Sequence, residues 1–264
     1  MRKTYPTDLS DTQWSRLRSY LPTPKAQGGP RTHSLRDVLD AIFYVLKSGC
    51  HWRLLPHDFP PGPTVYYHFR KLRLSGAWDL IYQALRGAER NRVGKNRDAS
   101  AAVIDSQSVK TAEEGARSNG YDAHKNVKGR KRHLLVDTLG LPLSVYVTSA
   151  DVQDRIGARC LLAGLKPFVP RLKKIWADGA YTGEKLAGWL EEQGGWELEI
   201  VERDREARDF EVLPNKRWIV ERTFSWLIRN RRLSKDYERL MQTSETFVVV
   251  AMIRLMLRRL ARGA

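Results

Sequence analysis

The sequence predicts a mixed α/β protein in which a small all-helical N-terminal domain precedes a mixed β-sheet flanked by helices. Between residues 11 and 88, apolar residues recur every three or four positions, which is typical of amphipathic helices. After residue 100 the pattern changes to short runs rich in β-branched residues, which indicate strands. Three such runs in succession, followed by alternating helical and strand-like segments, favour a mixed sheet covered by helices.

The N-terminal helices are delimited by residues that cap or break helices. Ser10 and Ser34 each precede a periodic run, and Gly49 follows the second run. Serine caps the first turn of a helix, and glycine tolerates the left-handed conformation that often ends one. The sequence FPPGPT at 59–64 interrupts the periodicity again. We therefore expect several short helices in this region.

The polar segment at 87–100, GAERNRVGKNRDAS, suits a connection rather than a core element. We place the domain boundary there, with a helical domain over residues 1–97 and a sheet-containing domain over residues 98–264. In the second domain we expect strands at 101–105, 132–137, 143–149, 174–178 and 196–202, and helices at 154–165, 183–193, 216–232 and 244–261.

The charge balance indicates a polyanionic partner. The 264 residues include 46 Lys and Arg against 30 Asp and Glu, a formal net charge of +16. The longest apolar stretch, 247–257, is interrupted by Arg254 and is far shorter than the roughly 20 residues that span a membrane. No apolar run follows the N-terminal charges as in a secretory signal, so we expect a cytoplasmic protein.

Two predicted strands end in aspartate, in the sequences AVIDS and IWADG. If these strands are neighbours, Asp105 and Asp178 lie in one crevice at the sheet edge, where ligands of open α/β sheets bind. Close carboxylates repel each other unless a cation lies between them, and Mg²⁺ or Mn²⁺ prefers such oxygen ligands. Phosphodiester chemistry on a polyanion then follows. The alternative is that each Asp only caps the following turn.

A third acidic candidate is Glu221, on the predicted helix within RWIVERTFSWLIRNRRL. Arg217 lies one turn before it on the same face. Taken alone, the two residues are as well explained by an ordinary surface ion pair.

Four segments, in this order, together resemble the insertion-sequence DDE transposases: DSQSVKT, NGYDAHKNVKGRKRHLLVDTLGLP, ADGAYTG and RWIVERTFSWLIRNRRLSKDYE. LSDTQWSRLRSYLP and SGCHWRLLPHDFPPGPTVYYHFRKL near the N-terminus resemble the IS-five-like branch of that group. The resemblance implies an RNase H-like fold for the sheet domain. It places the catalytic, metal-binding carboxylates at Asp105, Asp178 and Glu221, which would hold two Mg²⁺ or Mn²⁺ ions.

The resemblance also implies the activity and the partners. The enzyme would bind the terminal inverted repeats of an insertion sequence, cut them and join them to target DNA. Its partners would be double-stranded DNA and further copies of itself, as a dimer or higher assembly on DNA, with no membrane and no nucleotide cofactor. Two alternatives stay open: a metal-dependent nuclease that cuts without joining, and a DNA-binding protein that descends from a transposase but has lost catalysis.

The chain departs from the family pattern around Glu221. Pro214 stands where the family has tyrosine, and Ile228 stands where it has lysine. Arg229, Arg231 and Arg232 are close enough in sequence to supply the missing positive charge. A second departure is Ile156, where related chains often have aspartate in the sequence that begins at Asp154.

Basic residues near these carboxylates are candidates for DNA contact, since phosphate contacts dominate DNA affinity. Strand alternation sends Lys131 to one face of the sheet, and Arg130 and Arg132 to the other, so only part of that run need touch DNA. A solvated basic loop is the alternative. The candidates in this domain are Lys110, Lys125, Lys128, Arg130, Lys131, Arg132, Arg217, Arg229, Arg231, Arg232 and Lys235.

In the N-terminal domain, VYYHFRKLRLSG combines aromatic residues with Arg70, Lys71 and Arg73. This segment suits a recognition helix for the inverted repeats, and equally a core helix with a solvated basic face. Trp218 can stack on a base, although a tryptophan on an apolar helix face more often belongs to the core.

Overall fold

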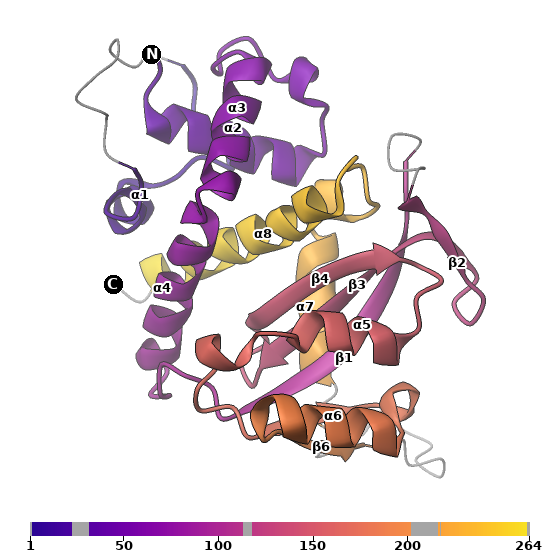
Figure 1. Ribbon diagram of the computed structural model, residues 1–264. Helices are drawn as coiled ribbons and strands as arrows, with labels where there is room; N and C mark the ends of the chain where they lie inside the picture. The colour runs from indigo at the N-terminus through magenta and orange to yellow at the C-terminus, as the bar shows by residue number, and fades with distance from the viewer. Residues whose placement is uncertain (1, 23–31, 113–117, 202–215, 217, 263–264) are drawn as a thin grey trace, which may run out of the picture. The chain divides into compact units, whose positions relative to one another are not determined.

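The helical character predicted for the N-terminal region is confirmed by the computed structural model, which describes residues 2–22, 32–112, 118–201, 216 and 218–262 (Figure 1). The contacts divide the chain into two compact units. Unit 1 comprises residues 1–95, 227–234 and 246–264, and unit 2 comprises residues 96–226 and 235–245.

Unit 1 is built from helices. They are α1 (Asp11–Arg18), α2 (Leu35–Ser48), the short η1 (Trp52–Leu54), α3 (Gly62–Leu74), α4 (Ala77–Arg92), η5 (Arg231–Leu233) and the part of α8 (Met241–Arg262) that follows residue 245. The predicted caps are present: the side chains of Ser10 and Ser34 accept hydrogen bonds from backbone N–H groups in the first turns of α1 and α2. Gly49 ends α2 in the left-handed conformation, with φ 74°.

The core of unit 1 is apolar and mainly aliphatic, with a group of aromatic rings within it. Phe69 of α3 stacks on Phe247 of α8, with 4.8 Å between the ring centroids. Trp78 of α4 is buried, and its indole N–H donates to the carbonyl of Phe69. None of the helices within the described residues is long and apolar enough to cross a membrane.

The polar segment expected to begin a connection at residue 87 is partly helical, because α4 continues to Arg92. Glu89 and Arg90 are buried in this helix. Glu89 forms an ion pair with Arg92 on the same helix and another with Arg259 of α8. The prediction that residue 87 begins a connection was wrong, because ion pairs allow charged residues of this segment to be buried in a helix.

Unit 2 contains a mixed sheet, as predicted, but within the described residues the sheet has six strands where five were expected, because β2 was not predicted. They are β1 (Ala101–Lys110), β2 (Gly120–Asp122), β3 (Val127–Asp137), β4 (Pro142–Ser149), β5 (Lys174–Ala177) and β6 (Glu197–Ile200). The strand order is β2-β3-β1-β5-β6, and β4 also pairs with β3. The first four strands pair antiparallel, whereas β5 is parallel to both β1 and β6.

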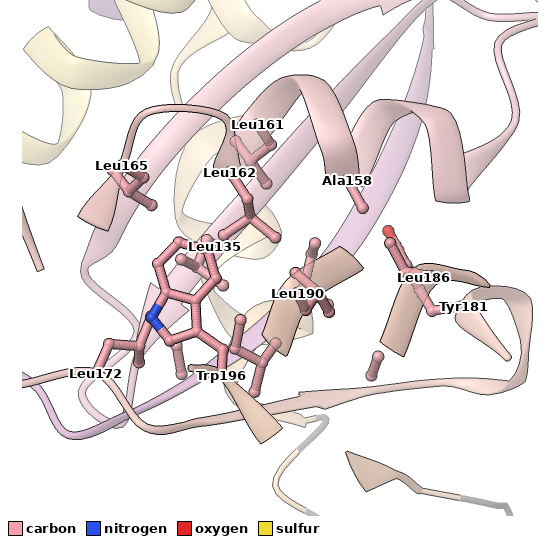
Figure 2. Packing of buried hydrophobic residues seen from close by; sticks show 14 of the residues in the cluster. Leu135, Ala158, Leu161, Leu162, Leu165, Leu172, Tyr181, Leu186, Leu190 and Trp196 are labelled. Carbon is pink, nitrogen blue, oxygen red and sulfur yellow. The ribbon is translucent and has the colours of Figure 1, made fainter. Parts of the chain in front are cut away.

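One face of this sheet is covered by α5 (Asp154–Leu162) and α6 (Glu184–Gly194). Ile104 of β1 and Ala177 of β5 point into a buried cluster with Leu161 of α5 and Leu190 of α6, closed at one end by Trp196 (Figure 2). Burial of these side chains is the main source of stability at this face. Because side chains alternate along a strand, Val103, Asp105 and Trp176 point to the opposite face.

The opposite face is covered by α7 (Trp218–Ile228), which begins in unit 2 (Figure 1). At its start, the Lys216 ammonium lies 3.6 Å from the centroid of the Trp176 ring. Farther along, the Thr223 hydroxyl donates to the carbonyl of Gly140, in the turn that joins β3 to β4. Arg222 donates to the carbonyl of Leu139 in the same turn. These contacts fix α7 against the sheet.

Candidate active site

The two aspartates that end predicted strands lie on neighbouring strands. In the parallel pairing of β1 with β5, Ala101 is opposite Lys174 and Val103 is opposite Trp176. Continuing this register by two residues brings Asp105 beside Asp178, the first residue after β5. The Asp105 side chain points to the α7 face of the sheet, because Ile104 before it points into the core beneath α5 and α6.

The predicted end of a strand at Asp105 was wrong, because β1 continues to Lys110. Both carboxylates accept a hydrogen bond from a nearby backbone N–H, and only Asp178 caps a turn. Asp178 Oδ1 accepts a hydrogen bond of 3.0 Å from the N–H of Ala180 and so caps the short helix η4 (Gly179–Tyr181). Asp105 Oδ1 accepts one of 2.7 Å from the N–H of Ser106. Turn capping and metal binding are compatible, because each carboxylate has two oxygens and about four acceptor positions.

A buried tyrosine connects these acids electrostatically. Tyr181 is 1% exposed in the core beneath α5 and α6. Burial, followed by the negative charges of Asp105, Asp154 and Asp178, raises the pKa of Tyr181 well above its ordinary value. The charges of Asp105, Asp154 and Asp178 therefore all act on this hydroxyl, close to where β5 ends.

Asp154 begins α5 and is tied to β1 next to Asp105. The Ser106 hydroxyl donates to Asp154 over 2.7 Å. Lys131 Nζ lies 3.3 Å from Asp154 and 3.4 Å from Asp122, and donates to the carbonyl of Val152. Although Asp122 is buried, the Ser108 hydroxyl, the Lys125 N–H and the two lysine charges lower its pKa. Apart from the acid in the first turn of α5, no local pattern predicts this network.

Lys125 approaches the same edge from the turn between β2 and β3. Its ammonium donates to the carbonyl of Ser106 over 3.0 Å and to the Ser106 hydroxyl over 3.2 Å. The side chain is otherwise exposed. A cavity of about 600 Å³ opens close by, lined by Asp122, Lys131, Asp154 and the start of η4. This part of the sheet therefore combines acids with cations that can form hydrogen bonds to a phosphate.

Glu221 lies in the first turn of α7 and is exposed. No group of three or more His, Cys, Asp or Glu side chains within the described residues is spaced to hold a metal ion. The predicted ligands thus do not form a ready-made group of three in this structure. The types of donor nevertheless fit Mg²⁺ or Mn²⁺, which take hard carboxylate oxygens. Arg217 and Pro214 lie outside the described residues, and Ile228 is 49% exposed.

Three predicted DNA contacts in β3 are buried. The predicted alternation of this strand is present, with Lys131 on the α5 face and Arg130 and Arg132 on the other. Arg130 pairs with Asp236 and donates to the carbonyl of Glu238 over 2.7 Å, and Arg132 donates to the carbonyl of Lys235. These side chains hold β3 to the 235–238 segment or to α5. We therefore do not include them in the proposed DNA interface.

The remaining DNA candidates differ in exposure. Arg232 is buried in unit 1, where it donates to the carbonyl of Cys50. Arg73 of α3 is half-buried, and the neighbouring Lys71 lies 5.7 Å from the Tyr67 ring. Trp218 is 43% exposed, with the Arg222 guanidinium over its ring, so it is not a core residue. The exposed candidates are Arg70, Lys71, Lys110, Lys125, Lys128, Arg229, Arg231 and Lys235.

The sheet order, the antiparallel and parallel strands and the covering helices are those of an RNase H-like domain, as the sequence resemblance implied. Residues 96–256 match the family model described as "Transposase DDE domain", and residues 9–82 match "Putative transposase of IS4/5 family". The first match covers more than half of the chain. The protein therefore belongs to the DDE transposase family.

Individual relatives are similar over parts of the chain. The chain is 31% identical over 118 residues to a putative transposase for insertion sequence element IS402 of Burkholderia cepacia, a match over 42% of this chain and 54% of the relative. It is 30% identical over 113 residues to an uncharacterised 16.2 kDa protein of the same element, over 40% of this chain and 76% of the relative. It is 45% identical over 65 residues to the uncharacterised protein y4sN of Sinorhizobium fredii, over 23% of this chain and 51% of the relative. The chain thus spans about half the length of the first and third relatives.

Proposed function

We propose that this protein is a DNA transposase that binds the terminal inverted repeats of an insertion sequence, cuts the ends and joins them to target DNA. The observation that supports the chemistry best is the register of Asp105 and Asp178 on adjacent parallel strands, in a chain of the DDE transposase family. Asp178 follows the C-terminal end of β5, and Asp105 lies beside it within the longer strand β1. Ligands of open α/β sheets bind at the C-terminal ends of their strands.

Asp105 and Asp178 are the residues that would hold a divalent cation, and Glu221 of α7 would add the third carboxylate. When bound, Mg²⁺ or Mn²⁺, with two ions per site, supplies Lewis-acid activation of an attacking oxygen and stabilisation of a leaving one. Asp154 is a positioning residue, because it accepts from Ser106, the residue after Asp105, and pairs with Lys131. No nucleotide is needed, since joining exchanges one phosphodiester for another.

Exposed cations of unit 2 would hold the DNA backbone near these acids. Hydrogen bonds define the position of Lys125 relative to the acids. Its ammonium donates to Ser106, the residue that follows Asp105. Lys110, Lys128 and Lys235 are exposed in the same unit. In unit 1, Arg70 and Lys71 on the exposed side of α3 would contact the inverted repeats. Cutting and joining two ends requires that both are held together, so we expect a dimer or larger assembly on DNA.

The test is a strand-transfer reaction with labelled DNA that contains the element's own ends, plasmid target, and Mg²⁺ or Mn²⁺. The variants are Asp105→Asn, Asp178→Asn and Glu221→Gln, with Glu192→Gln as the control because that exposed glutamate lies on α6. We expect the wild type and the control to yield end-cleaved and target-joined strands. Each of the three variants should lose both products by at least about 100-fold and still bind DNA.

The alternatives give different outcomes of the same reaction. Cleaved ends without joined strands would identify a metal-dependent nuclease. Tight DNA binding by the wild type with no cleavage under either metal would identify a DNA-binding protein that has lost catalysis. An active Glu221→Gln variant would remove Glu221 from the proposed metal site.

A further inference from the structure

Five cationic side chains gather on unit 1 from three separate segments of the chain. Lys47 lies in the last turn of α2, Arg229 and Arg231 adjoin or begin η5, and Arg254 and Arg258 lie on α8. We call these five residues the basic cluster. Four of them are exposed, and Arg254 is partly exposed.

Contacts hold the segments of the basic cluster together: α2 contacts the segment of Arg229 and Arg231, and η5 contacts α8 where the Arg232 guanidinium lies 5.4 Å from the Phe247 ring. Lys47 Nζ donates to the carbonyl of Arg229 over 2.7 Å. A Cβ atom added to Gly49, which ends α2, would lie 3.0 Å from the Cβ of Arg231, so α2 and η5 are in close contact. Arg254 and Arg258 are four residues apart on α8 and therefore share one face of that helix.

The charges of the basic cluster act on each other without a compensating acid. Burial, followed by the charges of Arg254, Arg258, Arg229 and Arg231, lowers the pKa of Lys47. Burial, followed by the charge of Arg258, lowers the pKa of Arg254. No carboxylate is among the causes for either residue. The fold thus keeps like charges together against their repulsion.

Elsewhere in unit 1 cations are paired with acids. Arg259, the residue after Arg258, lies 3.7 Å from Glu89. The other ion pairs among the described residues of this unit are Arg2 with Asp8 and Asp40, Arg36 with Asp11, and Arg92 with Glu89. The basic cluster takes part in none of these pairs. Arg259 of α8 and Arg92 of α4 are therefore neutralised by Glu89. The charges of the basic cluster face solvent and can attract an anionic partner.

We propose that the basic cluster binds the phosphate backbone of duplex DNA, and that the C-terminal helix α8 is thereby part of the DNA-binding surface of unit 1. Duplex DNA presents about one negative charge per 1.7 Å of helix axis, so a group of five cations can contact several phosphates at once. The inference refines the DNA-binding part of the proposed function and does not depend on the chemistry at Asp105. The sequence alone associates Arg229 and Arg231 with Glu221, whereas the structure groups them with α2 and α8.

The test compares two triple variants that remove the same charge from unit 1. One is Arg229→Gln, Arg231→Gln and Arg258→Gln in the basic cluster. The control is Arg16→Gln, Arg18→Gln and Lys95→Gln, three exposed cations on α1 and after α4. The full-length proteins are titrated with a random-sequence 30-base-pair duplex, labelled for fluorescence anisotropy, at several salt concentrations. The single variant Arg258→Gln provides a smaller step.

We expect the cluster variant to lose about 2.7 from the slope of log affinity against log salt, because each phosphate contact contributes about 0.9. Arg258→Gln should lose about 0.9, and the control should keep the wild-type slope. Equal losses in the two triple variants would overturn the proposal, because net charge alone would explain them. An unchanged slope in Arg258→Gln and in the cluster variant would also overturn it.

Failure of this inference and failure of the proposed function can be distinguished. If the cluster variant binds DNA like the wild type while the wild type cuts and joins its element's ends, the basic cluster is not the interface and the transposase proposal stands. If the cluster variant loses the salt-dependent affinity while the wild type shows no cleavage, the interface stands without the chemistry. Binding of the wild type to anionic phospholipid vesicles, lost in the cluster variant and unmatched by any change on DNA, would overturn the DNA assignment.

Discussion

The two units use positive charge in opposite ways. In unit 2, the run KGRKRH is the densest basic segment of that unit's sheet, yet Arg130, Lys131 and Arg132 are buried and bound to acids or carbonyls. In unit 1, cations far apart in sequence form an exposed cluster around Lys47. A run of basic residues in a sequence therefore does not locate the positive surface of a protein. The fold decides which cations are partnered and which face solvent.

The difference comes from where the compensating groups lie. Arg130 donates to the Ser118 hydroxyl over 2.7 Å and to the carbonyls of Glu238 and Arg239, and it pairs with Asp236. Asp236 in turn accepts from the Ser244 hydroxyl and the N–H of Glu238. Apart from Ser118, these partners lie more than 100 residues after Arg130 and reach it only when the segment that begins at Lys235 docks against β1 and β3.

Among these predictions, the substitution Arg130→Met should change the free energy of unfolding most. This variant removes one side of a buried ion pair and leaves the Asp236 carboxylate without its cation, which costs about 3–5 kcal/mol in the free energy of unfolding. Urea unfolding of the full chain measures this loss, with Arg231→Met as the matched surface control. Similar small losses in the two variants would contradict the contrast between the units.

The pH dependence of unit 2 supplies the next prediction. Burial, opposed by the charge of Asp154, lowers the pKa of His133 to about 4 from its ordinary 6.5. Below pH 6.5 His133 takes up a proton in the unfolded chain, whereas in the folded chain it stays unprotonated until about pH 4. Stability is therefore lost on acidification between these values, by up to about 3 kcal/mol.

The variant His133→Leu isolates this contribution. The difference in unfolding free energy between variant and wild type should change by up to about 3 kcal/mol in favour of the variant as the pH falls from 7 to 4.5. A difference that stays constant over this range would show that His133 does not titrate differently in the folded state. The loss of the hydrogen bond between His133 and Thr148 affects both ends of the range equally.

Unit 1 should respond to pH in the opposite direction through Asp40. Burial outweighs the hydrogen bond from the Leu9 N–H and the charge of Arg2, and raises the pKa of Asp40 to about 6. As the pH falls from 7 to 4, the folded chain takes up a proton before the unfolded chain does. Protonation of Asp40 therefore adds about 2 kcal/mol to the free energy of unfolding over this pH range.

Comparison of wild type with Asp40→Asn over the same pH range measures this contribution. The variant keeps a side-chain oxygen for the Leu9 N–H but cannot ionise. The wild type should gain stability relative to Asp40→Asn as the pH falls from 7 to 4. A loss, like that expected from His133, would mean that pairing with Arg2 dominates over burial.

Local patterns predicted much of the fold because local forces determine them. The apolar periodicity located the helices, and serine caps at Ser10 and Ser34 marked two of their starts within a residue. The alternation in β3 correctly assigned Lys131 and Arg130 to opposite faces. Periodicity did not reveal that both faces of that strand are covered, because the covering segments come from distant parts of the chain.

The candidate site was predicted unevenly for the same reason. An apolar run that stops at a carboxylate is a local signal, and it marked Asp105 and Asp178, although only Asp178 follows the end of a strand. Their catalytic role stays a prediction. The bonds of Asp154 to Ser106 and Lys131 depend on how α5 docks on the sheet, so no local pattern reveals them.

The smallest expected effect has the opposite sign to that of Arg130. Removing a charge from the basic cluster relieves repulsion among like charges that no acid of the described residues compensates. Arg258→Gln should therefore change the free energy of unfolding by no more than about 0.5 kcal/mol, and toward greater stability, most clearly at low salt where screening is weak. Urea unfolding at two salt concentrations measures it. If Arg258→Gln lowered the free energy of unfolding by more than about 1 kcal/mol, Arg258 would stabilise the fold as Arg130 does. Its role would then be structural and not the binding of a phosphate.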